Sequence, residues 1–144
     1  EKHVMVSLHS QFSRLFREWF DVILEDESIS VSVDGEFTPI IEQNGYETYI
    51  ENLSGGEKTS VALSYRLALN KVINDLVSGI KTKEILMLDE PTDGFSSEQL
   101  DKVRDVLNQL NMAQVIIVSH ENKIESFVSN VIRIQKQDGI SVVV

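Results

Sequence analysis

Two short apolar segments, each followed at once by polar residues, constrain the fold of this chain more than any other feature of the sequence. Ile85–Leu88 runs into Asp89-Glu90, and Val115–Val118 runs into Ser119-His120. Buried strands that alternate with a helix are typical of an α/β core with a parallel sheet. Ligands bind at the carboxyl ends of such strands, so the polar residues after each segment are candidates for a functional site.

The N-terminal segment is predicted to be an amphipathic helix with a regular apolar stripe. Its apolar residues alternate spacings of three and four, as in the seam of a coiled coil, at Met5, Leu8, Phe12, Leu15, Trp19 and Val22. Phe16, Phe20 and Ile23 widen the stripe near the end of the segment. The helix either packs on this domain's own core or is a coiled coil that enters a globular head. We take residues 1–24 as a coiled-coil root helix and residues 25–144 as the globular part.

An antiparallel flank is expected between this helix and the α/β core. Ile29–Val33, Phe37–Ile41 and Tyr46–Ile50 are short segments of strand character. They are separated by Asp34-Gly35 and Asn44-Gly45, which are typical hairpin turns. The three segments therefore predict an antiparallel meander.

The rest of the chain is predicted from helical period and turn chemistry. A long helix is expected from Ser54 to Gly79, and a second helix after a cap at Ser96 or Ser97. Two late strands are expected at Val131–Ile134 and Ile140–Val144, joined through Asp138-Gly139.

Composition excludes several classes of protein. The chain has 23 acidic and 13 basic residues, for a formal charge of −10, so a bulk basic nucleic-acid binder is not expected. Local contacts with DNA could still use basic side chains, at Arg14, Arg17, Lys81 and Lys83. The absence of cysteine excludes disulfides and thiolate metal sites. The longest apolar runs are too short to span a bilayer, which takes about 20 residues. The start of the chain has neither Met nor a signal peptide, which points to a non-secreted fragment.

Leu53–Glu57 opens the longest predicted helix and combines two signals. Ser54 and Glu57 have the spacing of a capping box, which is sufficient to explain these two residues. It does not explain Gly55 and Gly56, because each glycine in a helical turn costs about 1 kcal/mol relative to alanine. Glycines at a helix start let a phosphate approach the free N–H groups. We expect the segment both to cap the helix and to bind phosphate.

The residues at the ends of the two core strands suit phosphate chemistry. Asp89 could hold Mg²⁺, which takes oxygen ligands and keeps several waters, and Glu90 could orient an attacking water. His120 could donate to a phosphate oxygen. The alternatives are two solvated carboxylates before a turn and a histidine that serves only the turn. Lys58-Thr59 looks like the end of a Walker A loop, but the first glycine of that loop is replaced by Asn52, so the chain lacks a P-loop.

Taken together, the three motifs resemble a known family. Leu-Ser-Gly-Gly-Glu, Ile-Leu-Met-Leu-Asp-Glu-Pro-Thr and Val-Ser-His follow one another between Leu53 and Glu121, as in the C-terminal half of an ABC-type ATPase head. The chain starts with a heptad-like helix and lacks Walker A. This arrangement resembles the SMC and DNA-repair branch of the family, in which a coiled coil splits the head into two halves. The residues Tyr65–Leu69 on the signature helix resemble most the Rad50-type ATPase of double-strand-break repair, with SMC proteins as the near alternative.

This resemblance implies roles for the residues singled out above. Ser54, Gly55, Gly56 and Glu57 would contact the γ-phosphate of ATP held by an opposite head. Asp89 would support Mg²⁺, Glu90 would polarise the attacking water, and His120 would contact the γ-phosphate.

The resemblance extends to the loop after the second motif. Thr92–Gly94 would be the D-loop, with Asp93 at the interface between heads. Phe95-Ser96 departs from the Leu-Asp usual there, which puts the detailed contacts of this loop in doubt. Arg66 and Lys58 would be a switch pair that couples nucleotide state to the lobes, or simply two solvated basic residues.

The function implied is half of an ATP-driven clamp with ATP and Mg²⁺ as cofactors. The expected partners are an N-terminal Walker A half, a second identical head, a repair nuclease at the coil root, and DNA, with no membrane. The location implied is the cytoplasm, nucleoid or nucleus, and the isolated chain is expected to be inactive. The alternatives are an SMC, RecF/RecN-like or transporter head, and a free-standing metal-dependent hydrolase that uses Asp89, Glu90 and His120.

Overall fold

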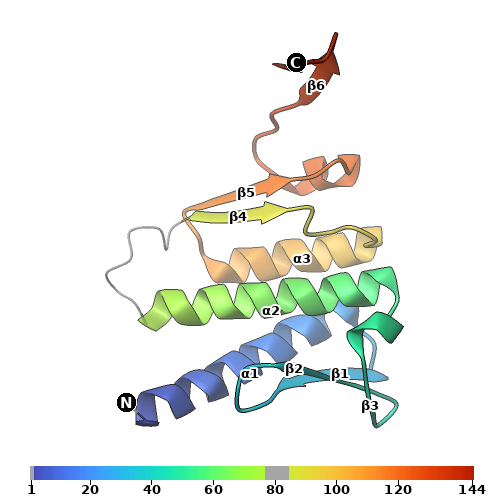
Figure 1. Cartoon of the computed structure of the whole chain (residues 1–144). Helices are drawn as coiled ribbons and strands as arrows, with labels where there is room; N and C mark the ends of the chain where they lie inside the picture. Colours follow the sequence, from blue (N-terminus) through green and yellow to red (C-terminus); the bar gives the residue numbers. More distant parts are fainter. Residues whose placement is uncertain (1, 77–84) are drawn as a thin grey trace.

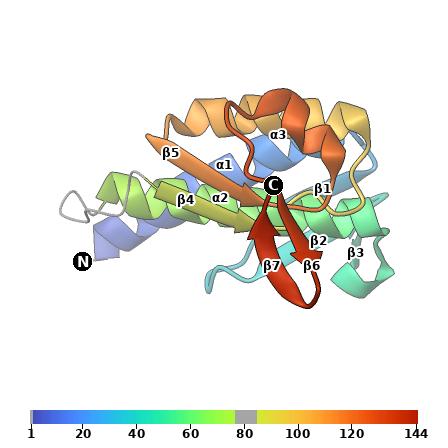
Figure 2. The same ribbon diagram turned by 90° about the horizontal axis from the view of Figure 1, so that it is seen from above.

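The computed structural model describes residues 2–76 and 85–144, which are arranged in layers (Figure 1). An antiparallel sheet lies against helix α1, and α1 packs on helix α2. Helices α2 and α3 lie beneath a parallel pair of strands, β4 and β5. The view from above shows the open face of that pair, with the C-terminal hairpin rising from it (Figure 2). The predicted α/β class is confirmed.

Helix α1, Lys2–Leu24, contributes the largest side chains of the core. Its buried face starts at Phe12 and is lined by aromatic and aliphatic residues, Phe12, Phe16, Trp19, Phe20 and Ile23. By contrast, Met5 and Val6 are 55% and 69% exposed. The helix is therefore confirmed, and from Phe12 onward it packs on this domain's own core. That its start continues as a coiled coil stays a prediction.

The antiparallel flank consists of β1 (Ile29–Val33), β2 (Pro39–Gln43) and β3 (Tyr46–Thr48), in the order β1-β2-β3. The meander is confirmed, but β2 lies two residues later than predicted and β3 is shorter than predicted. Phe37 has a φ of 66° and lies in the loop before β2. That loop is closed by the Asp34 carboxylate, which accepts from the amides of Glu36 and Thr38, each at 2.8 Å. Strand β3 ends at Thr48 because a 3₁₀ turn, η1 (Ile50–Asn52), follows.

The α/β core is built from α2 (Gly55–Leu76), β4 (Ile85–Asp89), α3 (Ser97–Leu110) and β5 (Gln114–Val118). Strands β4 and β5 are parallel, as predicted. Ser96 caps α3, because its hydroxyl accepts from the Gln99 amide while the Gln99 side chain accepts from the Ser96 amide. The predicted end of the first core helix at Gly79 lies outside the described residues.

The prediction that both core strands are fully buried is wrong. In β4, Leu86 and Leu88 face the helices and are buried, whereas Ile85 and Met87 are 46% and 67% exposed. The same side of β5 exposes Ile116 and Val118. The reason is that α2 and α3 cover one face of the pair, and nothing among the described residues covers the other.

The C-terminal hairpin is formed by β6 (Ile134–Gln137) and β7 (Ile140–Val143). The first late strand was predicted at Val131–Ile134 and in fact begins only at Ile134. The turn Asp138-Gly139, with φ values of 50° and 83°, places Gln137 opposite Ile140 and so fixes the register. Before the hairpin, a bidentate ion pair joins Arg133 to Glu125 in the 3₁₀ segment η3, Asn122–Phe127. No described helix has the length and apolarity that a membrane crossing requires.

Tyr65 on α2 joins three parts of the fold. Its ring meets Phe12 and Phe16 of α1 edge-on, at centroid distances of 4.9 and 5.5 Å. Its hydroxyl donates to the carbonyl oxygen of Phe37 in the loop before β2, at 2.9 Å. Tyr65 therefore ties α2 to both α1 and the antiparallel flank.

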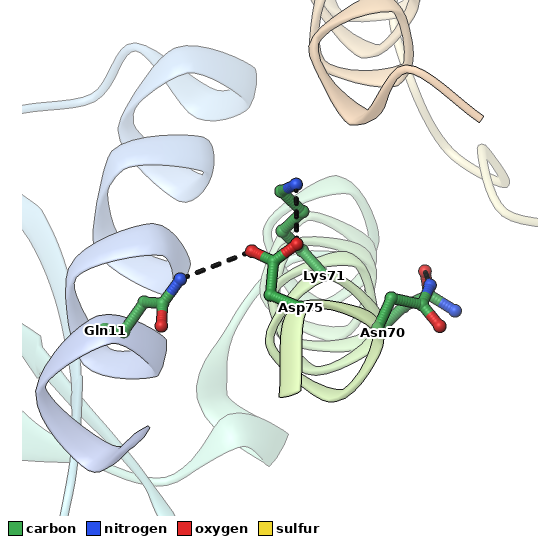
Figure 3. A network of polar contacts seen from close by, with 5 residues as sticks. Gln11, Asn70, Lys71 and Asp75 are labelled. Carbon is green, nitrogen blue, oxygen red and sulfur yellow. Dashed lines mark hydrogen bonds and ion pairs between the residues drawn. The ribbon is translucent and has the colours of Figure 1, made fainter. Parts of the chain in front are cut away.

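A polar network joins the same two helices at the other end of α2 (Figure 3). The Gln11 amide donates to the Asp75 carboxylate at 3.4 Å, and the other oxygen of that carboxylate pairs with Lys71 at 2.9 Å. Because these groups are exposed, we expect this network to contribute little to stability.

We predict that Tyr65→Phe lowers the free energy of unfolding by about 1 kcal/mol, because it removes one half-buried hydrogen bond and keeps the ring contacts. Urea denaturation measures this loss. The matched control is Tyr46→Phe, since Tyr46 is 79% exposed and should change stability little. Equal effects of the two substitutions would show that the Tyr65 hydroxyl ties nothing together.

Candidate functional site

The first turn of α2 is capped by its own sequence, as predicted. The Ser54 amide donates to Glu57 Oε2 at 2.6 Å, and the Glu57 amide donates to Ser54 Oγ at 3.4 Å. Ser54 remains exposed. The helix offers no partners for the other N–H groups of its first turn, and its dipole is positive there. The arrangement is a capped helix start that can still accept an anion.

The two glycines of this turn are in different environments. A Cβ atom added to Gly55 would have nothing within 4 Å. A Cβ atom added to Gly56 would lie 3.2 Å from the carbonyl oxygen of Gly94. Packing therefore explains Gly56, and the fold of this chain gives no reason for glycine at position 55. The sequence alone does not distinguish the two glycines, because the difference depends on a tertiary contact with Gly94.

The loop from Pro91 to Phe95 lies against the first turn of α2. Thr59 Oγ1 donates to the carbonyl oxygen of Asp93 at 2.9 Å, while the Asp93 residue itself is exposed. Gly94 has a φ of 79°, which favours glycine. The sequence-predicted residues of the α2 turn and Asp93 are thus brought together. Thr59 was missed, and no signal in the sequence pointed to this hydrogen bond.

The unusual residues at the end of this loop have structural roles. Phe95 is a core residue with 5% of its surface exposed, and its amide donates to the Thr92 carbonyl oxygen at 3.0 Å. Ser96 is the cap of α3. Phe95-Ser96 therefore anchors the loop to the core and starts the next helix.

Glu90 and His120 meet at the ends of the parallel strands. The ladder places Asp89 opposite Val118, and the Glu90 amide extends it by donating to the Val118 carbonyl oxygen at 2.9 Å. His120 Nδ1 lies 2.9 Å from Glu90 Oε1. This hydrogen bond raises the pKa of His120 and lowers the pKa of Glu90. Glu90 adopts a φ of 45°, an uncommon backbone conformation for a residue other than glycine.

Asp89 ends β4 and is exposed beside this pair. The described residues contain no cluster of three histidine or acidic side chains that could hold a metal by themselves. A single carboxylate at a strand end suits Mg²⁺, which commonly takes one or two carboxylates, several waters and the phosphates of a nucleotide. The residues present therefore fit Mg²⁺ bound together with a nucleotide.

A shallow cavity of about 510 Å³ lies between α2, η1 and the end of β4. Lys58 and Arg66, the predicted switch pair, line it together with Glu51 and Glu90. Two cations of α2 thus share one cavity with the carboxylate after β4. The structure brings this pair to the site, and the coupling role stays a prediction.

Structures of SMC proteins are among the solved structures that resemble this chain. One, from work on ATP-driven dimerization and DNA-stimulated activation of SMC ATPases, matches with a TM-score of 0.73 at 22% identity over 100% of this chain and 88% of that chain. An Smc head bound to the C-winged helix domain of ScpA matches with a TM-score of 0.71 at 21% identity over 94% of this chain and 42% of that chain. At these identities the likeness shows the fold alone, which is that of the class of SMC heads.

The sequence comparisons select one branch of that class. The chain is 31% identical over 131 residues to the DNA double-strand break repair Rad50 ATPase of Thermococcus kodakarensis, a match of 88% of this chain and 14% of that protein. The Rad50 ATPase of Thermoplasma acidophilum is 33% identical over 129 residues, 86% of this chain and 13% of that protein. No family model matches. The chain fits a segment of the Rad50-type ATPase head, as the three motifs predicted, and spans about one seventh of its relatives.

The two glycines should respond oppositely to alanine. Gly55→Ala should raise the free energy of unfolding by about 0.5 kcal/mol, because the site is open and the unfolded chain loses freedom. Gly56→Ala should lower it by about 1 kcal/mol, because the added methyl group presses on the Gly94 carbonyl. Chemical denaturation of the two variants measures both. Stabilisation by Gly56→Ala would refute the close packing of this loop.

The Glu90–His120 pair should titrate as a unit in the free chain. The raised His120 pKa means that its contribution to stability is full below the ordinary value of 6.5 and is lost as the pH rises through the raised pKa. The lowered Glu90 pKa means that its contribution is full above 4.5 and is lost as the pH falls through the lowered pKa. We therefore expect the contributions of both groups to stability to be full between pH 4.5 and pH 6.5. Glu90→Gln should shift the His120 pKa downward in an NMR titration, and an unchanged midpoint would exclude the contact.

Proposed function

We propose that this chain is half of an ATP-binding and ATP-hydrolysing head that dimerises on ATP. The observation that carries the proposal is the arrangement at one end of the core. The Glu90–His120 pair lies at the carboxyl ends of β4 and β5, and the loop bearing Asp93 follows β4. That loop contacts the first turn of α2 through the Thr59 hydrogen bond. The similarity to Rad50 ATPases supports ATP as the ligand and Mg²⁺ as its metal.

The chemistry then divides among the residues of this chain. ATP with Mg²⁺ supplies the reactive phosphoanhydride. Asp89 would hold the metal through an oxygen or a bound water, and Glu90 would orient and activate the attacking water. His120 would leave Glu90 and donate to the γ-phosphate. The turn Ser54–Glu57 would offer N–H groups to the γ-phosphate held by the opposite head.

The open face of β4 and β5 supports a missing N-terminal half as the first partner. A parallel pair is normally covered on both faces, yet Ile85, Met87, Ile116 and Val118 are exposed. The relatives are about seven times longer than the matched segment, so they contain further segments that could cover this face. We assign the face to the half that carries Walker A, and for that reason expect the isolated chain to be inactive.

Further parts of the proposal rest on the Rad50 relatives, which are described as DNA double-strand break repair ATPases. Hydrolysis would reopen the dimer and move the coiled coils that continue from α1, giving access to DNA ends. A repair nuclease would dock at the root of the coil, and DNA would be bound by the assembly. An SMC chromosome-structure role is the second candidate, favoured by the likeness of the fold to SMC heads.

Ser54→Arg tests the dimer. A bulky cation at the exposed cap should leave the fold intact, at a cost of about 1 kcal/mol for the lost cap, and should block the close approach of a second head. The measurement is the light-scattering mass of heads reconstituted with the N-terminal half, with and without ATP. Ser54→Ala is the matched control, because it removes the cap without adding bulk. Parental dimerisation by the arginine variant would reduce Ser54 to a cap alone.

Substitutions of the two neighbouring carboxylates, Asp89 and Glu90, should affect nucleotide binding and hydrolysis differently. In reconstituted heads, Glu90→Gln should bind ATP, stay dimeric and release phosphate at least about tenfold more slowly, the low end for loss of an acid–base group. Asp89→Asn should instead weaken Mg²⁺–ATP binding, since it removes charge at the metal. Phosphate release beside the dimer mass distinguishes them. Near-parental turnover of Glu90→Gln would take Glu90 out of the catalytic role.

A further inference from the structure

Thr59 differs from the two serines of α2 in where its side chain donates. Ser60 Oγ donates to the Gly56 carbonyl and Ser64 Oγ to the Ser60 carbonyl, each within the helix. Such bonds to the preceding turn are the usual choice for a helical serine or threonine. Thr59 Oγ1 instead leaves the helix and donates to the Asp93 carbonyl oxygen, at 2.9 Å, 34 residues away in sequence.

A second contact fixes the same loop on the same turn. The carbonyl oxygen of Gly94 sits 3.2 Å from the place where Gly56 would carry a Cβ atom. Conversely, a Cβ atom on Gly94 would lie 3.4 Å from the Gly56 nitrogen. Backbone lies against backbone, with the Thr59 hydrogen bond beside it. Phe95, buried in the core, holds the far end of the loop.

We propose that Thr59 is a positioning residue that locks the Asp93 loop to the first turn of α2, so that the two move as one body. The inference rests on the proposed function for its consequence, because both elements would face the opposite head. A change in one would then reach the other without an intermediate segment. Thr59 itself need not contact nucleotide, since its hydroxyl is engaged with the Asp93 carbonyl.

The lock can be tested without nucleotide in the chain itself. Thr59→Val keeps the branched shape and removes the donor, so the loop should open more often. Amide hydrogen exchange at Phe95, whose N–H donates to the Thr92 carbonyl, should quicken by about three- to tenfold, the range for one lost hydrogen bond. Exchange at Val106, fully buried in α3, monitors global stability and should change less. Thr59→Ser retains the hydroxyl and should restore the parental rate. Unchanged exchange at Phe95 in Thr59→Val would overturn the lock.

The consequence is tested in heads reconstituted with the N-terminal half. Thr59→Val should leave the affinity for Mg²⁺–ATP unchanged, weaken ATP-dependent dimerisation by at least about threefold, and be rescued by Thr59→Ser. Faster exchange at Phe95 with parental dimerisation would overturn the positioning role. If the parental heads themselves fail to dimerise, the proposed function fails, and the exchange experiment still decides whether Thr59 locks the loop.

Discussion

The parallel register of β4 and β5 is the constraint on which the site depends. Because Asp89 lies opposite Val118, the chain leaves both strands at the same level, and the Glu90 amide continues the ladder to the Val118 carbonyl. Glu90 and His120 then meet at 2.9 Å although 30 residues separate them. A slip of one residue would turn Leu86 and Leu88 away from the helices, so burial of these side chains enforces the register.

From the same strand end the chain turns back onto α2, which links the two parts of the site. Thr92 is buried, the Asp93 and Gly94 carbonyls rest on the first helical turn, and Phe95 enters the core. In its middle, α2 is tied through Tyr65 to α1 and to the Phe37 carbonyl. Helix α2 therefore begins at the Gly55-Gly56 turn and contacts both the loop with Asp93 and helix α1. This continuity is the physical basis for coupling between nucleotide and coil in our proposal.

Much of this architecture could be predicted from the sequence, because local chemistry determines it. The Ser54–Glu57 capping box, a cap at the start of α3, the Asn44-Gly45 turn and the parallel pairing follow from spacing and turn residues. The prediction that β4 and β5 are buried on both faces was wrong, because none of the described residues packs on the outer face of these strands. The start of β6 was wrong because the Asp138-Gly139 turn, and not the apolar run, sets the register. The unlike glycines and the bond from Thr59 to Asp93 depend on tertiary contacts between distant segments, which periodicity does not reveal.

The central claim is that the chain holds only half of a nucleotide site, and calorimetric titration with Mg²⁺–ATP tests it most directly. In heads of this class the P-loop supplies most contacts to the phosphates, and the sequence lacks that loop. We expect no measurable binding by the isolated chain and stoichiometric binding once the N-terminal Walker A half is added. Tight, stoichiometric binding of ATP by the isolated chain would contradict it.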